Sequence, residues 1–172
     1  MSEVNLYIFI TAHGPRKQDG AFAWVLELIR QNGDPDPRTL SGVGVRQQTI
    51  DRNLVLEAIA QALSHLSKPC EVTIILDPAY LAETTPTPWE QGWVENWEKN
   101  GWKNAKGQEI KSADLWKSAL AVLRNHHAVF TKIRGYNTYK NWALTEIDRA
   151  LQNNSGVSDD PGSKDKVYKA WR

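Results

Sequence analysis

The chain has 172 residues, of which 41% are hydrophobic and 24% charged, and this composition predicts one globular domain with a hydrophobic core. The formal net charge of +1 excludes attraction to phosphate through total charge, so binding of nucleic acid would need a local basic patch. A single cysteine, Cys70, excludes an internal disulfide, and the N-terminus has no basic stretch followed by an apolar run. No stretch of the sequence nears the roughly 18 consecutive apolar residues of a membrane span. We therefore expect a cytoplasmic monomer that does not enter a membrane.

The first half of the chain predicts a meander of three strands. Residues 4–11 and 21–29 are apolar and β-branched runs, and turn residues around Gly14 and Pro15 separate them. Asn, Gly, Asp and Pro crowd residues 32–37, after which the chain can return as a third strand over residues 39–48.

A helix and a buried strand are expected next. Asp51 is placed to cap a helix that ends before Pro69 and whose apolar residues recur at spacings of three and four. These residues are Val55, Ile59, Ala62 and Leu66. Residues 72–76 are continuously apolar or β-branched, as in a strand covered on both faces, and Asp77 follows them. Asp77 fits either a metal ligand or a solvated carboxylate that caps a helix starting at Pro78.

The second half of the chain alternates helical and extended patterns. Helical periodicity runs over residues 88–100 and 112–125, with a lysine-rich loop between them. Residues 129–133 predict a last strand, and residues 140–151 predict a closing helix. Strands followed by alternating helices and strands indicate an α/β fold with a five-stranded mixed sheet flanked by helices.

The C-terminal residues differ in composition from the rest. Residues 152–166 are rich in Ser, Gly and Asp and too poor in apolar groups to order themselves. We therefore expect a domain over residues 1–151 and a flexible tail over residues 152–172. The basic and aromatic end of this tail could fold onto nucleic acid or a partner protein.

Three stretches of sequence carry a resemblance to a known family. Residues 93–103 read WVENWEKNGWK, and residues 107–116 continue as GQEIKSADLW. This block is similar to the basic handle, and the helix after it, of the ribonuclease H family, bacterial type 1 enzymes in particular. Residues 71–80 look like the family's strand with a metal-binding aspartate, and residues 133–136 like its apolar, basic, glycine and histidine stretch. The likeness covers roughly residues 4–151 and implies a ribonuclease H-like fold with a basic handle.

The resemblance also implies a two-metal hydrolysis, in which acidic side chains hold two magnesium ions about 3.5 to 4 Å apart. The first strand of the family ends in an aspartate, where this chain has Thr11. The first helix supplies a glutamate, where this chain has Val55, or Leu54 in the neighbouring alignment. Glu57 lies two or three residues away, on another side of the helix. Asp77 matches the family's aspartate, so one of these three positions keeps its acid.

The last helix leaves its acidic position open. Counting forward from Gly135 gives Glu146, whereas matching the last helix of the family gives Thr145, which we prefer. Tyr136 replaces the family's histidine. The resemblance thus implies a degenerate site with Asp77 and Glu146 as vestiges, able to hold at most one magnesium ion weakly, through Asp77. We expect no required cofactor, with Mg or Mn involved only if residual activity exists.

The handle combines aromatic and basic side chains that can lean on sugars while neutralising phosphates. By the resemblance, the residues expected to contact nucleic acid there are Trp97, Lys99, Trp102, Lys103, Lys106 and Lys111. Two loops that approach the RNA/DNA hybrid bound by the family's enzymes add Arg16, Lys17, Arg52 and Asn53. The alternative is that the tryptophans pack the handle helix on its neighbour, which we expect for Trp93 and Trp116.

The histidines have ordinary interpretations. His13 is expected to be a plain loop residue, because no partner stands at ligand spacing. His126 and His127 follow a predicted helix, where they can interact with its dipole.

Three functions remain open. The first is a noncatalytic protein that binds RNA/DNA hybrid or structured RNA. The second is a divergent, weakly active hybrid endoribonuclease with replacement ligands, namely Asp77, Glu146, Glu57 and Asp148. The third is a protein-interaction scaffold that binds no nucleic acid.

Overall fold

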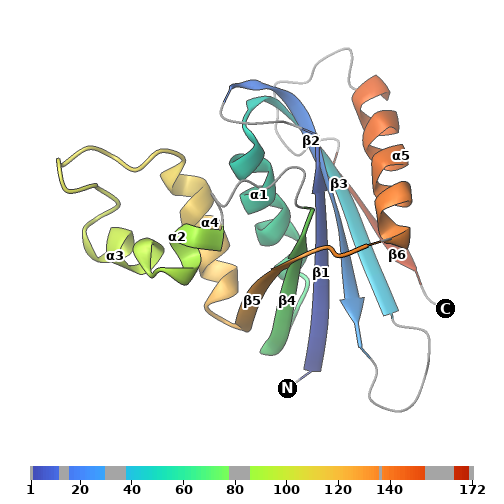
Figure 1. The fold of residues 1–172 in the computed structure, drawn as a ribbon, viewed down its shortest axis with the longest axis horizontal. Helices are drawn as coiled ribbons and strands as arrows, with labels where there is room; N and C mark the ends of the chain where they lie inside the picture. The colour runs from blue at the N-terminus through green and yellow to red at the C-terminus, as the bar shows by residue number, and fades with distance from the viewer. Residues whose placement is uncertain are drawn as a thin grey trace.

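The computed structural model describes residues 2–11, 16–29, 38–77, 86–135, 137–153 and 165–170, and a six-stranded sheet lies at its centre (Figure 1). In spatial order the strands are β5 (His127–Lys132), β4 (Cys70–Leu76), β1 (Ser2–Ile10), β2 (Gln18–Leu28), β3 (Arg38–Thr49) and β6 (Lys166–Ala170). Strands β1, β4 and β5 run parallel, whereas β1–β2, β2–β3 and β3–β6 are antiparallel pairs. The predicted α/β fold with a mixed sheet is confirmed, and β1 to β3 form the predicted meander.

Helices cover both faces of the sheet. They are α1 (Asp51–Leu63), α2 (Pro86–Glu90), α3 (Trp93–Lys99), α4 (Ala113–Leu123) and α5 (Thr138–Asn153). Because side chains alternate along β1, Ile8 enters the large core shared with α1 and α4, whereas Phe9 enters the smaller core under α5. Helices α2, α3 and α4 form a lobe beside the sheet (Figure 1), which together with the loop at residues 100–112 we call the handle. Among the described residues, no helix is long and apolar enough to span a membrane.

Two glycines in β3 make room for large aromatic rings of β2. Gly42 lies opposite Trp24 and Gly44 opposite Phe22 in the antiparallel register. A Cβ atom at Gly42 would lie 2.5 Å from the Trp24 indole, and one at Gly44 would lie 2.4 Å from Phe22 Cζ. Both rings are fully buried, so these glycines permit the packing of the core beneath α1.

The predicted sheet is one strand short, because β6 comes from the segment that we assigned to a tail. Asp165, directly before β6, accepts hydrogen bonds at 2.8 Å from both terminal nitrogens of Arg46 in β3. Gln61 of α1 donates to the same carboxylate at 2.9 Å, and Arg46 Nε donates to Glu57 Oε1 at 2.9 Å. This network joins residues 119 positions apart, so local composition could not indicate it. Where the domain ends along the sequence stays a prediction.

Two helix predictions also need correction. The helix predicted over residues 88–100 is divided into α2 and α3 at Gly92, which has a φ of +75°. Asp51 is the first residue of α1 and not its cap, since Ile50 holds the capping position. The Asp51 carboxylate instead accepts a hydrogen bond from the N–H of Arg52 at 2.7 Å.

Candidate active site and nucleic-acid interface

Asp77 lies directly after β4 and is buried, with 4% of its surface exposed. The Nζ atom of Lys140, in the first turn of α5, is 2.9 Å from Asp77 Oδ2. The Lys140 side chain is 41% exposed, so the ion pair joins the buried end of β4 to the solvent side of α5. A buried carboxylate is stable only beside positive charge or hydrogen-bond donors, and Lys140 supplies that positive charge.

Thr11 lies just beyond the end of β1, at the same edge of the sheet as Asp77. The parallel pairing places Ile8 of β1 opposite Leu76 of β4, so the two strands end at the same edge of the sheet. The Thr11 hydroxyl accepts a hydrogen bond from the N–H of Ala21 at 3.0 Å, and the Thr11 N–H donates to the Ala21 carbonyl at 3.1 Å. Thr11 is therefore bonded to β2 through both its backbone and its hydroxyl, and it offers no carboxylate.

Helix α1 turns an apolar surface toward the sheet at both alignment positions. Leu54 and Val55 are fully buried in the large core. Glu57, the nearby acid, pairs with Arg46 and so faces β3. For Glu57 to serve in place of the family's glutamate, its carboxylate would have to leave the ion pair with Arg46.

The two candidate acidic positions of α5, Thr145 and Glu146, have hydrogen-bond partners other than Asp77. Thr145 is exposed, and its hydroxyl donates to the Asn141 carbonyl at 2.9 Å. Glu146 accepts hydrogen bonds from Arg149 at 2.8 Å and from the Tyr168 hydroxyl of β6 at 3.4 Å. Within the part of the chain that the structure describes, no three His, Cys, Asp or Glu side chains are grouped to hold a metal ion. His13 and Tyr136 lie outside the described residues.

Trp97 and Trp102 of the handle pack against the core cluster that contains Trp116 of α4. Trp116 is buried in the large core as expected, and the Trp97 ring meets it edge-on at 5.3 Å between centroids. Trp102 is half-buried, and Lys117 Nζ lies 5.6 Å from its ring centre. Trp93 was predicted to pack inside but is 47% exposed, because α3 starts there and buries Val94 instead.

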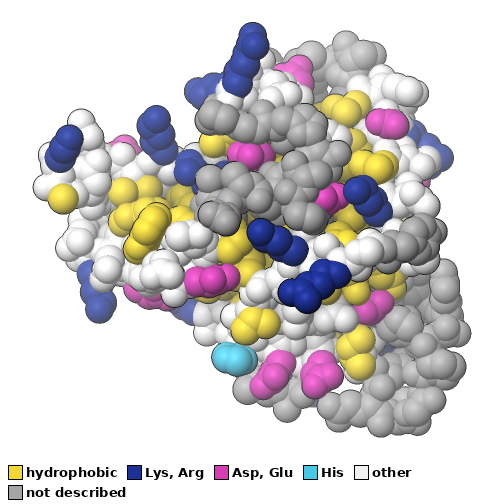
Figure 2. Space-filling view, in the orientation of Figure 1, with side chains coloured by type: hydrophobic (Ala, Val, Ile, Leu, Met, Phe, Trp, Pro, Cys, Tyr) yellow, Lys and Arg dark blue, Asp and Glu magenta, His cyan; other side chains and the backbone are white. Residues whose placement is uncertain are grey.

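The lysines of the handle stand in solvent. Lys99, Lys103, Lys106 and Lys111 are all exposed. In Figure 2 basic side chains rim the handle around a group of hydrophobic ones. The exposed lysines are accessible to phosphate, and their roles in binding stay predictions.

The start of α1 adjoins the handle through Arg52. Its guanidinium carbon lies 5.8 Å from the centre of the Trp116 ring. Burial lowers the pKa of Arg52, and the charge of Asp51 acts in the opposite direction. Among the described residues, the buried atoms Arg52 Nε and Asn53 Oδ1 have no hydrogen-bond partner. Arg16 and Lys17, before β2, are exposed.

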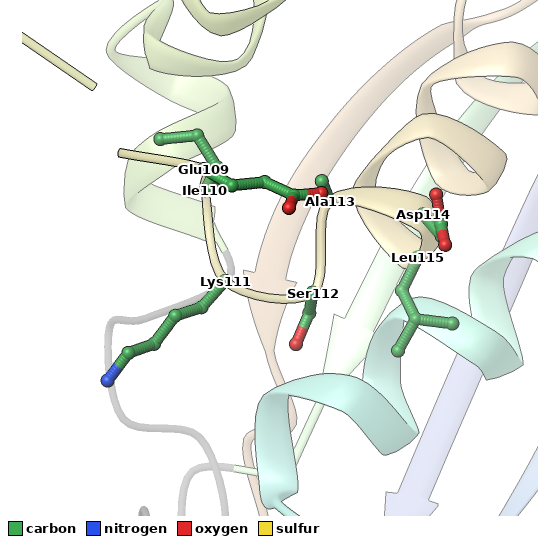
Figure 3. Close-up of a pocket in the computed structure, with 7 residues that line it drawn as sticks. All are labelled: Glu109, Ile110, Lys111, Ser112, Ala113, Asp114 and Leu115. Atoms are coloured by element: carbon green, nitrogen blue, oxygen red, sulfur yellow. The ribbon is translucent and has the colours of Figure 1, made fainter. Parts of the chain in front are cut away.

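A pocket of about 560 Å³ lies where the loop of the handle meets α4, and residues 109–115 line it (Figure 3). Ser112 turns the chain there with a φ of +60°. Lys111 extends away from α4 in this view, whereas Asp114 and Leu115 lie on the first turn of the helix. The lysine side chain therefore does not pack on the helix that follows it.

His126 does not act as a cation at the end of α4. Its Nδ1 accepts a hydrogen bond from the N–H of Cys70 at 3.0 Å, which requires that nitrogen to be unprotonated. Burial lowers the pKa of His126, which favours the same neutral form. His126 therefore links the end of α4 to the start of β4.

Comparison with known proteins identifies the family. The family model for RNase H matches residues 15–152, which is most of the chain. The chain belongs to the RNase H family. A curated ribonuclease H from Lachnoclostridium phytofermentans is 32% identical over 135 residues, covering 78% of this chain and 82% of the relative. One from Caldicellulosiruptor saccharolyticus is 35% identical over 95 residues, and the match spans only 63% of that relative's length.

Solved structures of RNase H proteins share the fold. LC9-RNase H1, described as a type 1 RNase H with the type 2 active-site motif, superposes with a TM-score of 0.69 at 18% identity, covering 98% of this chain and 78% of that one. The foamy viral protease-reverse transcriptase in complex with RNA/DNA hybrid superposes with a TM-score of 0.54 at 13% identity, covering 91% and 20%. At these identities the likeness establishes the fold alone.

Lys140 is the site residue that sequence reasoning missed. It lies far from Asp77 along the chain, and one lysine near the start of a helix carries no signal by itself. The pairing depends on how α5 is docked, which sequence periodicity does not specify.

Proposed function

We propose that this RNase H-family chain binds RNA/DNA hybrid or structured RNA without cleaving it. The observation that carries the proposal is at the edge of the sheet formed by β1 and β4. In the preferred alignment, of the four positions where the family places acidic ligands, Asp77 alone has a carboxylate, and that carboxylate pairs with Lys140.

The residues at this edge do not fit a pair of magnesium ions. Magnesium takes oxygen ligands in near-octahedral geometry, and two ions need several carboxylates between them. The Thr11 hydroxyl is engaged by Ala21, and Leu54 or Val55 offers only hydrocarbon. We therefore propose that no metal cofactor is required.

The alternative of an active, divergent nuclease has less support. It would use Glu57 and Glu146 as replacement ligands, but each pairs with an arginine. Glu57 faces β3 and Glu146 faces β6, whereas Asp77 faces Lys140. Recruiting both acids would require two ion pairs to break and α1 to rotate.

Binding of nucleic acid is supported by the family and by the surface of the handle. A solved relative is in complex with RNA/DNA hybrid. Exposed lysines beside partly exposed tryptophans suit phosphate neutralisation and sugar contact. Arg52, whose guanidinium carbon lies 5.8 Å from the centre of the Trp116 ring, connects the start of α1 to the handle.

The test is to measure binding and cleavage of the same labelled RNA/DNA hybrid in magnesium and in manganese. We expect salt-dependent binding and an intact RNA strand. The triple variant Lys103→Ala/Lys106→Ala/Lys111→Ala should bind more weakly, and its salt slope should fall by roughly 0.7 to 0.9 for each phosphate that it no longer neutralises. Lys68→Ala, which removes an exposed lysine outside the handle, is the control and should change neither quantity.

Two results would overturn the proposal. Robust cleavage that disappears in Asp77→Asn would show an active metal site. Binding that does not depend on salt, or is absent for every nucleic acid, would favour the scaffold hypothesis, because a protein that neutralises phosphates releases counterions.

A further inference from the structure

The ion pair between Asp77 and Lys140 places a protein cation beside the buried carboxylate. Asp77 is nearly fully buried at the edge where β1 and β4 end. In a metal-dependent site, the charge of such a carboxylate is balanced by the bound cation. Here an ammonium group 2.9 Å away balances it.

The position of Lys140 is fixed by its neighbours on α5. The Tyr139 hydroxyl donates to the carboxylate of Glu27 in β2, and the Tyr139 ring packs on Tyr7 of β1 at 5.1 Å between centroids. One turn further on, Ala143 is buried in the core under α5. These contacts hold the first turn of α5 over the sheet, and so they position the backbone of Lys140 within reach of Asp77.

Thr11 lies on the same side of the sheet as α5. Tyr7 and Phe9 of β1 pack in the core under α5, and alternation places Thr11 on that side. Asp77 follows Leu76, whose side chain enters the opposite core, so its own side chain also lies on the α5 side. The ammonium therefore sits on the side of the sheet where a cation bound to these positions would sit.

We propose that Lys140 is the resident cation of this site and excludes divalent metal ions from Asp77. This inference rests on the proposed function and extends it: the site is blocked by a positive charge, besides having too few ligands. A second cation beside Asp77 would be repelled by the ammonium at close range. Removing the lysine charge should therefore open Asp77 to one metal ion, which the shortage of ligands alone would not predict.

The test uses the full chain and Mn²⁺ as the probe, with binding measured by calorimetry and by electron paramagnetic resonance. The wild type should show no saturable binding. Lys140→Gln, which keeps a hydrogen-bond donor but removes the charge, should gain one saturable Mn²⁺ per chain. Adding Asp77→Asn should abolish that gain, and Lys140→Arg, which keeps the charge, should behave as the wild type does.

Two outcomes would overturn the inference. One is saturable Mn²⁺ binding by the wild type that Asp77→Asn removes. The other is no gain of binding in Lys140→Gln when its circular dichroism matches that of the wild type. If Lys140→Gln fails to fold, Lys140→Met provides the second neutral variant, and absence of binding there would count equally against the inference.

These outcomes are separate from those for the proposed function. Hybrid cleavage by the wild type would overturn the proposed function itself. Hybrid binding without cleavage, combined with no metal gain in the neutral variants, would leave that function standing and refute only the role of Lys140.

Discussion

Replacing Asp165 with alanine removes the carboxylate that joins β6 to β3 and α1. In the folded chain Asp165 accepts three hydrogen bonds, two from Arg46 and one from Gln61. The side chains of Asp165 and Arg46 are only 12% and 11% exposed, so solvent screens the pair weakly. The variant should therefore destabilise the fold and weaken the pairing of β6.

The magnitude follows from what Arg46 retains. Removing one partner of a buried ion pair costs about 3 to 5 kcal/mol, because the other charge is left buried. Arg46 keeps Glu57 as a second partner, and Gln61 keeps its bond from the Trp24 indole, so we expect a smaller loss of about 2 to 3 kcal/mol. For a chain of this length that corresponds to a fall in Tm of roughly 4 to 12 °C.

Urea unfolding and thermal melting of the full chain measure this loss. Amide hydrogen exchange adds a local readout, because β6 pairs with residues 39–43 of β3, and these amides should exchange faster in the variant. Asp148→Ala, an exposed carboxylate on α5, is the control and should stay within about 0.5 kcal/mol of the wild type. An Asp165→Ala protein that melts with the wild type and keeps slow exchange in β3 would refute the reasoning.

Two further predictions concern His126 and Gly42. The pKa of His126 is lowered in the folded chain, so the unfolded chain binds the proton more readily, and stability should be full above the ordinary value of 6.5 and decrease as pH falls below it. Urea unfolding at about pH 7.5 and about pH 5.5 should show this decrease in the free energy of unfolding, and the decrease should be smaller in His126→Gln. An equal decrease in the wild type and in His126→Gln would contradict the prediction. Gly42→Ala places a Cβ atom 2.5 Å from the Trp24 indole and should lower the free energy of unfolding by about 1 to 3 kcal/mol. Ser41→Ala is its neighbouring control, and equal stability of both variants would show that the ring can shift freely.

Local sequence patterns predicted most of the fold, because most of its elements carry their own signal. The β-branched runs of the meander, the periodicity of α1 and the apolar strand before Asp77 each depend on residues close in the chain. Strand β6 lacks such a signal, since its place depends on Asp165 meeting Arg46 across the fold. Gly92 divides the handle helix at a single left-handed residue, which helical spacing alone does not reveal.

The sequence predicted where Thr11 and Asp77 lie in the fold better than it predicted which residues they contact. Sequence matching brought Thr11 and Asp77 to one edge of the sheet, and the parallel register of β1 and β4 agrees. It gave no indication of Lys140, because the reach of a lysine from α5 depends on tertiary docking. Trp93 was expected inside, but an amphipathic pattern cannot tell which of several tryptophans faces solvent when the helix is only two turns long.

Charge explains how the fold tolerates the residues at the edge of β1 and β4. Close carboxylates repel one another unless cations neutralise them, so a metal-binding edge is costly to a chain without its ions. Here Thr11 bonds to β2, Leu54 adds to the core, and Asp77 has Lys140, so each position favours folding without a metal. The handle follows a different logic, because its aromatic residues pack around the buried Trp116 and so serve stability as well as surface. Under the proposed function, the chain folds without the carboxylates of a metal site, and the packing of Trp97 on Trp116 holds α3, which carries the exposed Lys99.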